Sequence, residues 1–281
     1  MLRGIDIASH QGRPLWDAVD KSRMDFVFVK ASGGGTYRNE YHDEQVDNAR
    51  RRGAVIGHYH YAHELSFEAH RPFLAYSPEA EAAWFIKCAK PQPGDLLALD
   101  IEDPAVPANY DLEEWSLRWL RYVEQAAGCK PFLYSYPYYV SEHGLNAWAL
   151  NRYPLWLASY VTPYRDNWNP TPPSVWPKWT IWQWSGGSKL RGFDFDTDEN
   201  VFLGTRAELL ALGVPGVQAQ TKPFVHAPGF IGPPLVDNFN WGGDTAGIIV
   251  KRETTVYNDE LKQFFLLRWT PEHGVEIIPI K

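Results

Sequence analysis

The sequence predicts an α/β protein: an irregular β/α barrel closed by β-hairpins and followed by a small C-terminal β module. Up to about Gly213, short apolar segments alternate with amphipathic ones, which is typical of parallel strands joined by crossover helices. After residues 155–160 the amphipathic segments stop, and glycine-rich turns join the remaining strands. This change favours closing hairpins over a uniform eightfold barrel or a Rossmann sheet.

The barrel strands are expected where apolar, often β-branched or aromatic residues form short runs. These runs are residues 4–8, 26–31, 55–62, 96–101, 131–136, 155–160, 179–184 and 193–201. Helices are expected where apolar residues recur with the helical period. They are residues 15–21, 40–52, 78–90 and 112–127, a broken helical region at 140–150, and a closing helix at 205–212.

The C-terminal part has a different composition. Residues 214–234 are rich in Pro, Gly, Gln and Thr, as expected of a linker. Beyond them, residues 247–252, 254–257, 263–269 and 275–280 alternate with the two-residue period of strands. We therefore predict a barrel domain at 1–213, a linker at 214–234 and a small β-rich module at 235–281.

The composition excludes several classes of protein. The 281 residues carry a formal net charge of -7 without a long Lys/Arg cluster, so nucleic-acid binding is not expected. Two cysteines, Cys88 and Cys129, are too few for a disulfide framework or a cysteine-based zinc site. We expect no membrane span and no signal peptide, because neither apolar pattern is present. Thirteen Trp and fifteen Tyr supply rings that can pack in a core or stack on sugars.

Three acidic residues fall at the carboxyl ends of two expected strands, the end where β/α barrels form their active sites. Asp6 ends the first strand, and Asp100 and Glu102 end the fourth. Residues i and i+2 of a strand point to one side, so Asp100 and Glu102 would lie with Cα atoms about 6.5 Å apart. Such carboxylates raise each other's pKa, and one can stay protonated near neutral pH. A protonated acid beside an ionised one is what glycosidic cleavage requires.

The alternative for each acid is structural: a solvated carboxylate at a strand end, or a helix N-cap near Asp103-Pro104. The pair Asp100 and Glu102, next to an apolar strand, favours the catalytic interpretation.

A series of segments resembles one known family. In chain order they are residues 4–12 (GIDIASHQG), 26–32 (FVFVKAS), 57–62 (GHYHYA), 99–103 (LDIED), 132–135 (FLYS), 155–160 (LWLASY), 182–185 (WQWS) and 198–202 (DENVF). Together they resemble the glycoside hydrolase family 25 lysozymes, the muramidases common among phage endolysins. The resemblance covers residues 1 to about 213, and its specificity comes from the whole series rather than from the short Asp-x-Glu motif.

The resemblance implies a flattened (β/α)5β3 barrel, TIM-like but irregular, with an acidic groove at the carboxyl ends of the strands. It implies that Glu102 is the general acid and that Asp100 is the neighbouring carboxylate. Asp6 and Asp198 match the remaining acids of the groove, with Asp194 and Asp196 as rivals of Asp198. Lys30 sits where the family has a lysine, either pairing with one of these acids or forming an ordinary interior salt bridge.

By the same correspondence, five further side chains are expected to line the groove. They are Tyr59, Tyr134, Gln183, Trp184 and Asn200. For each aromatic residue, core packing is the alternative. The sequence departs from the family at Gly33, where a Glu is usual. The run from Gly33 to Gly35 is no phosphate loop, because no Gly-Lys-Ser/Thr follows, and we expect a flexible turn at the groove mouth.

His58, His60 and His63 raise the question of a metal site. Nearby acids at ligand spacing are absent from the sequence, so we expect core packing and neither a metal nor a cofactor. Because strand residues alternate, Tyr59 and Tyr61 should face away from the first two histidines, and Tyr59 is assigned to the groove.

The resemblance implies an endolysin muramidase that hydrolyses the β-1,4 linkage between N-acetylmuramic acid and N-acetylglucosamine in bacterial peptidoglycan. Glu102 would act as acid and then base, while Asp100 assists the substrate acetamido group; direct attack by a carboxylate is the alternative. Two other functions stay open: a non-catalytic glycan-binding barrel and a glycosidase on a chitin-like polymer.

We expect a monomer in the cytoplasm of the infected or producing bacterium, which reaches the wall through a holin-type pore. The C-terminal module is expected to bind the wall or to extend the groove.

Overall fold

The computed structural model describes residues 1–63, 76–103, 106, 110–161, 163–165, 168–173 and 175–216, and the backbone of three strands between residues 252 and 279. The chain divides into two compact units, Met1–Gln218 and Ala219–Lys281. Each unit is described by itself.

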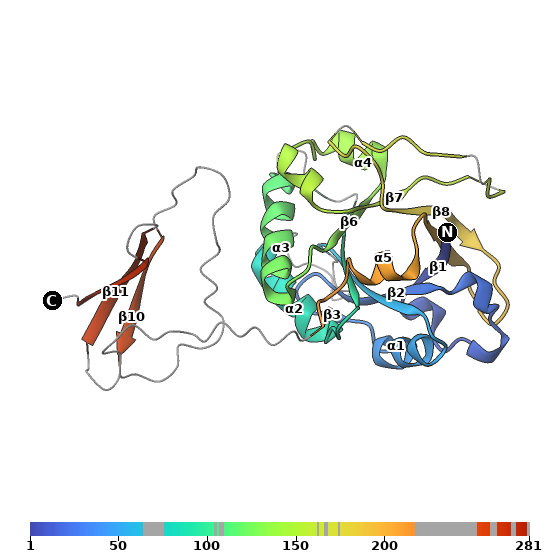
Figure 1. Ribbon diagram of the computed structural model, residues 1–281, viewed down its shortest axis with the longest axis horizontal. Coiled ribbons are helices and arrows are strands. Elements are labelled where there is room, and N and C mark those ends of the chain that lie inside the picture. Colours follow the sequence, from blue (N-terminus) through green and yellow to red (C-terminus); the bar gives the residue numbers. More distant parts are fainter. Residues whose placement is uncertain are drawn as a thin grey trace. The chain divides into compact units, whose positions relative to one another are not determined.

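The first unit is a closed barrel with helices on its outside (Figure 1). Its sheet has the order β1-β9-β8-β7-β6-β5-β4-β2-β3, and an additional pairing of β1 with β2 closes the barrel, leaving β3 at the edge. The strands are β1 Leu2–Ile7, β2 Phe26–Gly33, β3 Tyr37–Arg38, β4 Val55–Tyr61, β5 Leu96–Asp100, β6 Phe132–Ser135, β7 Leu155–Ala158, β8 Ile181–Ser188 and β9 Thr197–Phe202. The predicted (β/α)5β3 architecture is confirmed.

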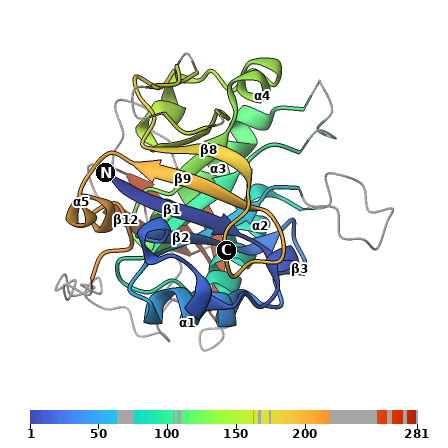
Figure 2. The same cartoon turned by 90° about the vertical axis from the view of Figure 1, so that its right-hand side faces the viewer.

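The barrel strands β1, β2, β4, β5, β6, β7 and β8 are parallel to their neighbours in this order. Strand β9 runs antiparallel to both β8 and β1 (Figure 2), and the edge strand β3 runs antiparallel to β2. The helices are α1 His42–Arg51, α2 Pro78–Ala89, α3 Leu112–Ala127, α4 Pro137–Glu142 and α5 Arg206–Leu210, with short 3-10 turns at Ser9–Gln11, Trp16–Ala18, Lys21–Arg23 and Trp148–Arg152. Helices α2 and α3 begin at side-chain caps, which satisfy free backbone N–H groups. Ser77 accepts from the Ala80 N–H before α2, and Asp111 accepts from the Glu114 N–H before α3.

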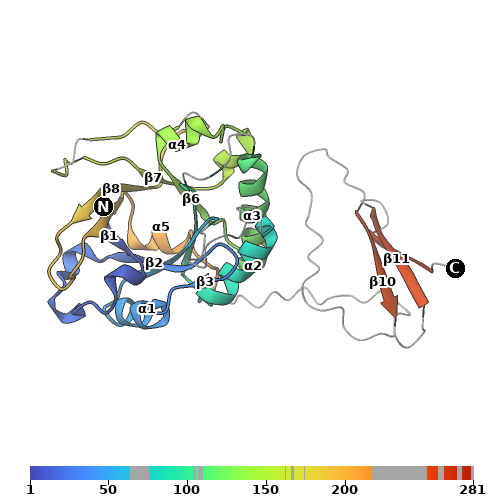
Figure 3. The same cartoon turned by 180° about the vertical axis from the view of Figure 1, so that it is seen from behind.

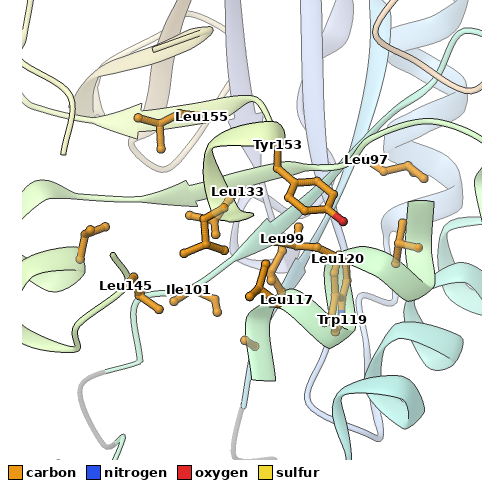
Figure 4. Close-up of a cluster of buried hydrophobic side chains, with 14 of the residues drawn as sticks. Leu97, Leu99, Ile101, Leu117, Trp119, Leu120, Leu133, Leu145, Tyr153 and Leu155 are labelled. Atoms are coloured by element: carbon orange, nitrogen blue, oxygen red, sulfur yellow. The ribbon is translucent and has the colours of Figure 1, made fainter. Parts of the chain in front are cut away.

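The alternation of strand side chains separates two hydrophobic layers. On β5, Leu96 and Ala98 face the barrel interior, while Leu97 and Leu99 face the outer layer under α2 and α3. Figure 4 shows the outer cluster, in which leucines of β5 to β7 meet Trp119 and Leu120 of α3. The same alternation turns Asp100, the last residue of β5, toward the interior.

Aromatic rings fill the middle of the barrel. Phe28 stacks on Trp156 with ring centroids 4.3 Å apart, and Phe132 packs against Phe28 edge to face. Gly57 makes room for this group, because a Cβ there would lie 2.3 Å from the Phe28 ring. Burial of each such ring contributes about 1.5–3 kcal/mol to stability. Helix α5, drawn in orange in Figure 3, contributes Leu209 to the inner cluster, so the middle of the barrel is a packed core.

Two expected elements differ from the structure. Residues 15–21 are not one helix: Leu15 is exposed and donates its N–H to the Gly192 carbonyl, and two separate 3-10 turns follow. The strand expected at 193–201 begins only at Thr197. In both segments, contacts between them override the helix or strand that the local sequence favours. Trp16 of the first packs on Phe193 of the second, with ring centroids 6.1 Å apart.

The second unit contains a three-stranded antiparallel sheet, β10 Arg252–Asn258, β11 Gln263–Thr270 and β12 Gly274–Pro279. These strands overlap the segments expected at 254–257, 263–269 and 275–280. The expected strand at 247–252 and the linker beyond residue 216 lie almost wholly outside the described residues. Within the described part of the chain, no helix has the length and apolarity that a membrane crossing requires.

Candidate active site

The structure brings the four predicted acids together at one end of the barrel. Asp6 lies near the end of β1, directly opposite Asp198 of the antiparallel β9. Asp100 ends β5, paired with Tyr61 of β4 and Tyr134 of β6, and Glu102 follows it. Asp6 and Asp100 are each 6% exposed, whereas Glu102 and Asp198 are half-buried, so solvent reaches these last two side chains.

Asp6 is held by two side-chain amides. Its Oδ1 accepts hydrogen bonds from Gln183 Nε2 at 2.9 Å and from Asn200 Nδ2 at 2.6 Å. Gln183 and Asn200 are paired neighbours on β8 and β9, and both are 1% exposed. These two predicted lining residues therefore act as partners of a carboxylate rather than as an open surface.

Asp198 shares a hydrogen bond with Asp6, which requires a proton between the two carboxyl groups. Burial and the charge of Asp6 raise the pKa of Asp198 to about 9. Burial also raises the pKa of Asp6, while hydrogen bonds from Asn200, Gln183 and Asp198 act against this rise. One proton therefore stays on the pair at neutral pH.

Glu102 has a pKa raised to about 7, mainly by burial and next by the charge of Asp6. Lys30 and a hydrogen bond with Tyr134 act in the opposite direction. The sequence analysis expected its near neighbour Asp100 to cause this rise. The expected contribution of burial is confirmed, but the expected partner was wrong: the carboxylate with the largest effect is Asp6, which the closed barrel brings close from the first strand.

Lys30 lies at the same end of the barrel. Its ammonium group lies 4.7 Å from the ring centroid of Tyr61 and 5.1 Å from that of Tyr37. Tyr37 reaches this position because Gly33 and Tyr37 pair in the β2–β3 hairpin, whose turn includes Gly34 at φ 48°. The glycine run is thus a tight turn that carries an aromatic residue to the site, and β3 was missed in the sequence analysis.

Tyr59 and Tyr134 both belong to the inner cluster, as the alternation predicted for Tyr59. Burial and the surrounding acids raise the pKa of each phenol, so both hydroxyl groups stay protonated. Trp184 is a correction. It lies in the outer cluster with its ring 5.2 Å from that of Tyr164, because the side chains on either side of the inward Gln183 point outward.

Tyr160 was missed in the sequence analysis as a site residue. Its hydroxyl donates to Gln183 Oε1 at 3.1 Å, and its side chain is 61% exposed. It lies two residues after the inward-facing Ala158, so the two-residue period past the strand end is the signal that could have found it. An exposed ring anchored to the acid cluster is suited to stacking on a ligand.

The histidines are structural. His58 bonds to His42 at 2.9 Å and to Asp95 at 3.1 Å, and His60 bonds to Glu81 at 2.9 Å, all in the layer outside the barrel. Their acidic partners come from other elements, which sequence spacing did not reveal. In the described ranges, no group of three or more His, Cys, Asp or Glu could hold a metal ion.

A cavity of about 840 Å³ lies at the other end of the strands. Its walls include residues that precede β5, β6 and β8, among them Gly94, Lys130 and Thr180, and none of its lining residues is acidic. It is therefore separate from the acid cluster.

The acid cluster can transfer a proton near neutral pH. A carboxylic acid with a pKa of about 7 is protonated enough to donate and acidic enough to do so readily. Ionised carboxylates beside it can stabilise positive charge that develops on a substrate. This combination fits acid-assisted cleavage of an acetal, in which a leaving oxygen is protonated while the adjacent carbon becomes cationic.

Comparisons with known proteins agree with this chemistry. The family model described as Glycosyl hydrolases family 25 matches residues 5–193. The uncharacterised protein YegX of Escherichia coli K12 is 30% identical over 216 residues, covering 75% of this chain and 72% of YegX. Lysozyme M1 of Streptomyces globisporus is 29% identical over 225 residues, covering 75% and 71% of the two chains.

A solved bacterial lysozyme from Streptomyces coelicolor superposes with a TM-score of 0.65 at 25% identity, covering 75% of this chain and 96% of that one. The family match spans most of the barrel and includes three of the four acids. The chain therefore belongs to glycosyl hydrolases family 25 and is a glycoside hydrolase.

Proposed function

We propose that the protein is a muramidase that hydrolyses the β-1,4 linkage between N-acetylmuramic acid and N-acetylglucosamine in bacterial peptidoglycan. One observation carries the proposal: Glu102 is half-buried and reachable by solvent, has a pKa of about 7, and lies among carboxylates. Likeness to Lysozyme M1 supports the substrate class.

In the proposed mechanism, Glu102 donates its proton to the glycosidic oxygen and then, as a carboxylate, activates the water that completes hydrolysis. The substrate acetamido group attacks the anomeric carbon, and Asp100 stabilises the positive charge on the ring that forms. A polymer without the acetamido group that is cleaved at full rate would exclude this route in favour of attack by a carboxylate.

The test replaces Glu102 by Gln, which keeps the shape of the side chain and removes its proton. Release of reducing ends from purified peptidoglycan should fall by at least about a hundredfold. Glu142→Gln is the matched control. Glu142 is exposed on α4, where it accepts a hydrogen bond from the exposed Tyr138, and this variant should retain wild-type activity. Near wild-type activity in the Glu102 variant would refute the assignment.

The same assay separates the other functions. A glycan-binding barrel without turnover would pellet with peptidoglycan and release no reducing ends. A glycosidase of chitin-like polymers would release products from N-acetylglucosamine homopolymers, and mass spectra of the products would identify the sugars at the cleaved bond.

The biological setting is part of the proposal. We propose an endolysin that stays in the cytoplasm of the infected or producing bacterium until a holin-type pore gives it access to the wall. Expression inside Escherichia coli should lyse cells only when a holin is expressed as well. Lysis without the holin would contradict this route.

We also propose that the C-terminal module binds the cell wall. Its sheet is a separate compact unit, Ala219–Lys281. Truncation should follow Gln218, because Val214 still exchanges backbone hydrogen bonds with Gly94 and Asp95 of the barrel unit. The truncated protein should cleave soluble wall fragments normally and pellet less with intact walls; equal pelleting would contradict a wall-binding role.

A further inference from the structure

We infer that Asp6 is the member of the Asp6–Asp198 pair that ionises first, that Asp198 keeps the proton, and that Gln183 and Asn200 are positioning residues that set this order. The order follows from hydrogen-bond directions among residues of β1, β6, β7, β8 and β9. Only its effect on catalysis rests on the proposed function.

Asn200 has a fixed orientation. Its Oδ1 accepts a hydrogen bond from the indole N–H of Trp156 at 2.7 Å. An indole nitrogen can only donate, so the oxygen of Asn200 must face it. The NH₂ group of Asn200 is thereby turned to Asp6 Oδ1, where it donates at 2.6 Å.

Gln183 has the same arrangement. Its Oε1 accepts from the hydroxyl of Tyr134 at 2.9 Å and from that of Tyr160 at 3.1 Å. Its Nε2 then donates to Asp6 Oδ1. Two amide N–H groups on one oxygen occupy its acceptor positions and favour the ionised form of Asp6.

Asp198 has no such donors among the hydrogen bonds of the described residues. Its bond with Asp6 raises its pKa, whereas the same bond lowers that of Asp6. The charge of the adjacent Asp196 also favours the protonated form of Asp198. The charged and titratable groups around the pair are Lys30, Tyr59, Asp100, Glu102, Tyr134, Tyr160 and Asp196.

The ionisation of Asp6 is linked to the protonation of Glu102 in two ways. The negative charge of Asp6 favours a protonated Glu102. A hydrogen-bonded chain also links them: Glu102 to Tyr134, Tyr134 to Gln183, and Gln183 to Asp6. Tyr134 donates its hydroxyl proton to Gln183, and Gln183 donates to the Asp6 anion, so Tyr134 connects the surroundings of Glu102 with the amide that favours ionised Asp6.

The first test uses the wild-type full-length chain labelled with ¹³C at Asp and Glu carboxyl carbons. As pH rises, the signal of Asp6 should move to its ionised position before that of Asp198, and Asp198 should still be protonated at pH 7. The reverse order, or an ionised Asp198 at pH 6, would overturn the inference. This measurement needs no variant and no substrate.

The second test compares Asp198→Asn with Asp6→Asn. An amide at position 198 mimics the neutral acid, so the titration midpoint of Glu102 should stay within about half a pH unit of wild type. Asp6→Asn removes the anion and should lower that midpoint by about one unit or more. Equal shifts in the two variants, or a larger one in Asp198→Asn, would contradict the inference.

Wall cleavage adds a separate readout. Asp198→Asn should keep at least about a tenth of wild-type kcat/KM, whereas Asp6→Asn should lose its activity at neutral pH while retaining more at acidic pH. If the wild-type protein cleaves no wall, the proposed function fails, and the carboxyl titrations still decide the order of ionisation.

Discussion

Gly186 lies directly against the ring of Tyr160. A Cβ atom at position 186 would lie 2.8 Å from both the Cζ and the hydroxyl oxygen of that ring, which is closer than van der Waals contact allows. The missing side chain of Gly186 therefore permits the exposed Tyr160 to reach Gln183 and the acid cluster.

Gly186→Ala should displace Tyr160 and raise KM about three- to tenfold with little change in kcat, because loss of an aromatic contact costs about 0.5–1.5 kcal/mol of binding. Tyr160→Ala should show the same pattern in steady-state kinetics on soluble wall fragments. Gly187→Ala is the control, since a Cβ there makes only an ordinary contact, 3.7 Å from Asp196 Oδ2. A KM unchanged by Gly186→Ala would remove Tyr160 from the substrate site.

In the proposed mechanism Glu102 donates a proton, so the alkaline limit of kcat/KM should lie near pH 7, where Glu102 loses it. The ammonium group of Lys30 lowers the pKa of Glu102. Lys30→Met should therefore move this limit to higher pH, and a pH–rate profile measures the shift. Movement to lower pH would show that Lys30 acts on another group.

Glu102→Gln should stabilise the protein above neutral pH. The native pKa of Glu102 is about 7 against an ordinary 4.5, so native Glu102 binds a proton more strongly than in the unfolded chain. The stability that it contributes is lost as pH rises from about 4.5 to 7. The variant should gain about 1–3 kcal/mol at pH 8 and little at pH 4, as measured by denaturant unfolding. A uniform effect at both pH values would contradict this origin.

Two buried histidines should make the protein sensitive to acid. Burial, as the largest cause, lowers the pKa of His42 and of His63 to about 4. The unfolded chain takes up these protons near pH 6.5, so stability should fall as pH drops from about 6.5 to 4, by about 1–3 kcal/mol for each group. His63→Asn, which suits the positive φ of 61°, should be less stable at pH 7 but should lose less on acidification. An equal loss in both proteins would exclude His63 as a source.

The barrel could be predicted because its strands, buried on both faces, form short apolar runs, while its long helices bury one face and leave a pattern with the helical period. Helix α3 was predicted at its observed bounds, since Asp111 and Gly128 mark its ends with a cap and a left-handed residue. A helix was predicted wrongly at residues 15–21 because the backbone conformation there depends on contacts with Gly192 and Phe193, which lie far away in the sequence. Contacts of that kind leave no local periodicity.

The acids could be found from strand ends and from the resemblance, but their electrostatic partners could not. Burial was expected to raise the pKa of Glu102 and does so; sequence distance pointed to Asp100 as the carboxylate that adds to this rise, whereas the closed barrel brings Asp6 to Glu102. Trp184 was assigned to the groove because the resemblance matches its position in the chain, but a match of positions does not say which face of β8 a side chain occupies. The alternation that placed Tyr59 correctly would have placed Trp184 as well.

The pairing of β1 with β9 has a consequence for synthesis on the ribosome. Asp6 on β1 is translated before its two amide partners and Asp198, which all lie on the β8–β9 hairpin at the end of the barrel sequence. A nascent chain that lacks this hairpin has Glu102 without its finished electrostatic surroundings. The Asp6–Asp198 pair therefore forms only when the last barrel strand docks beside the first.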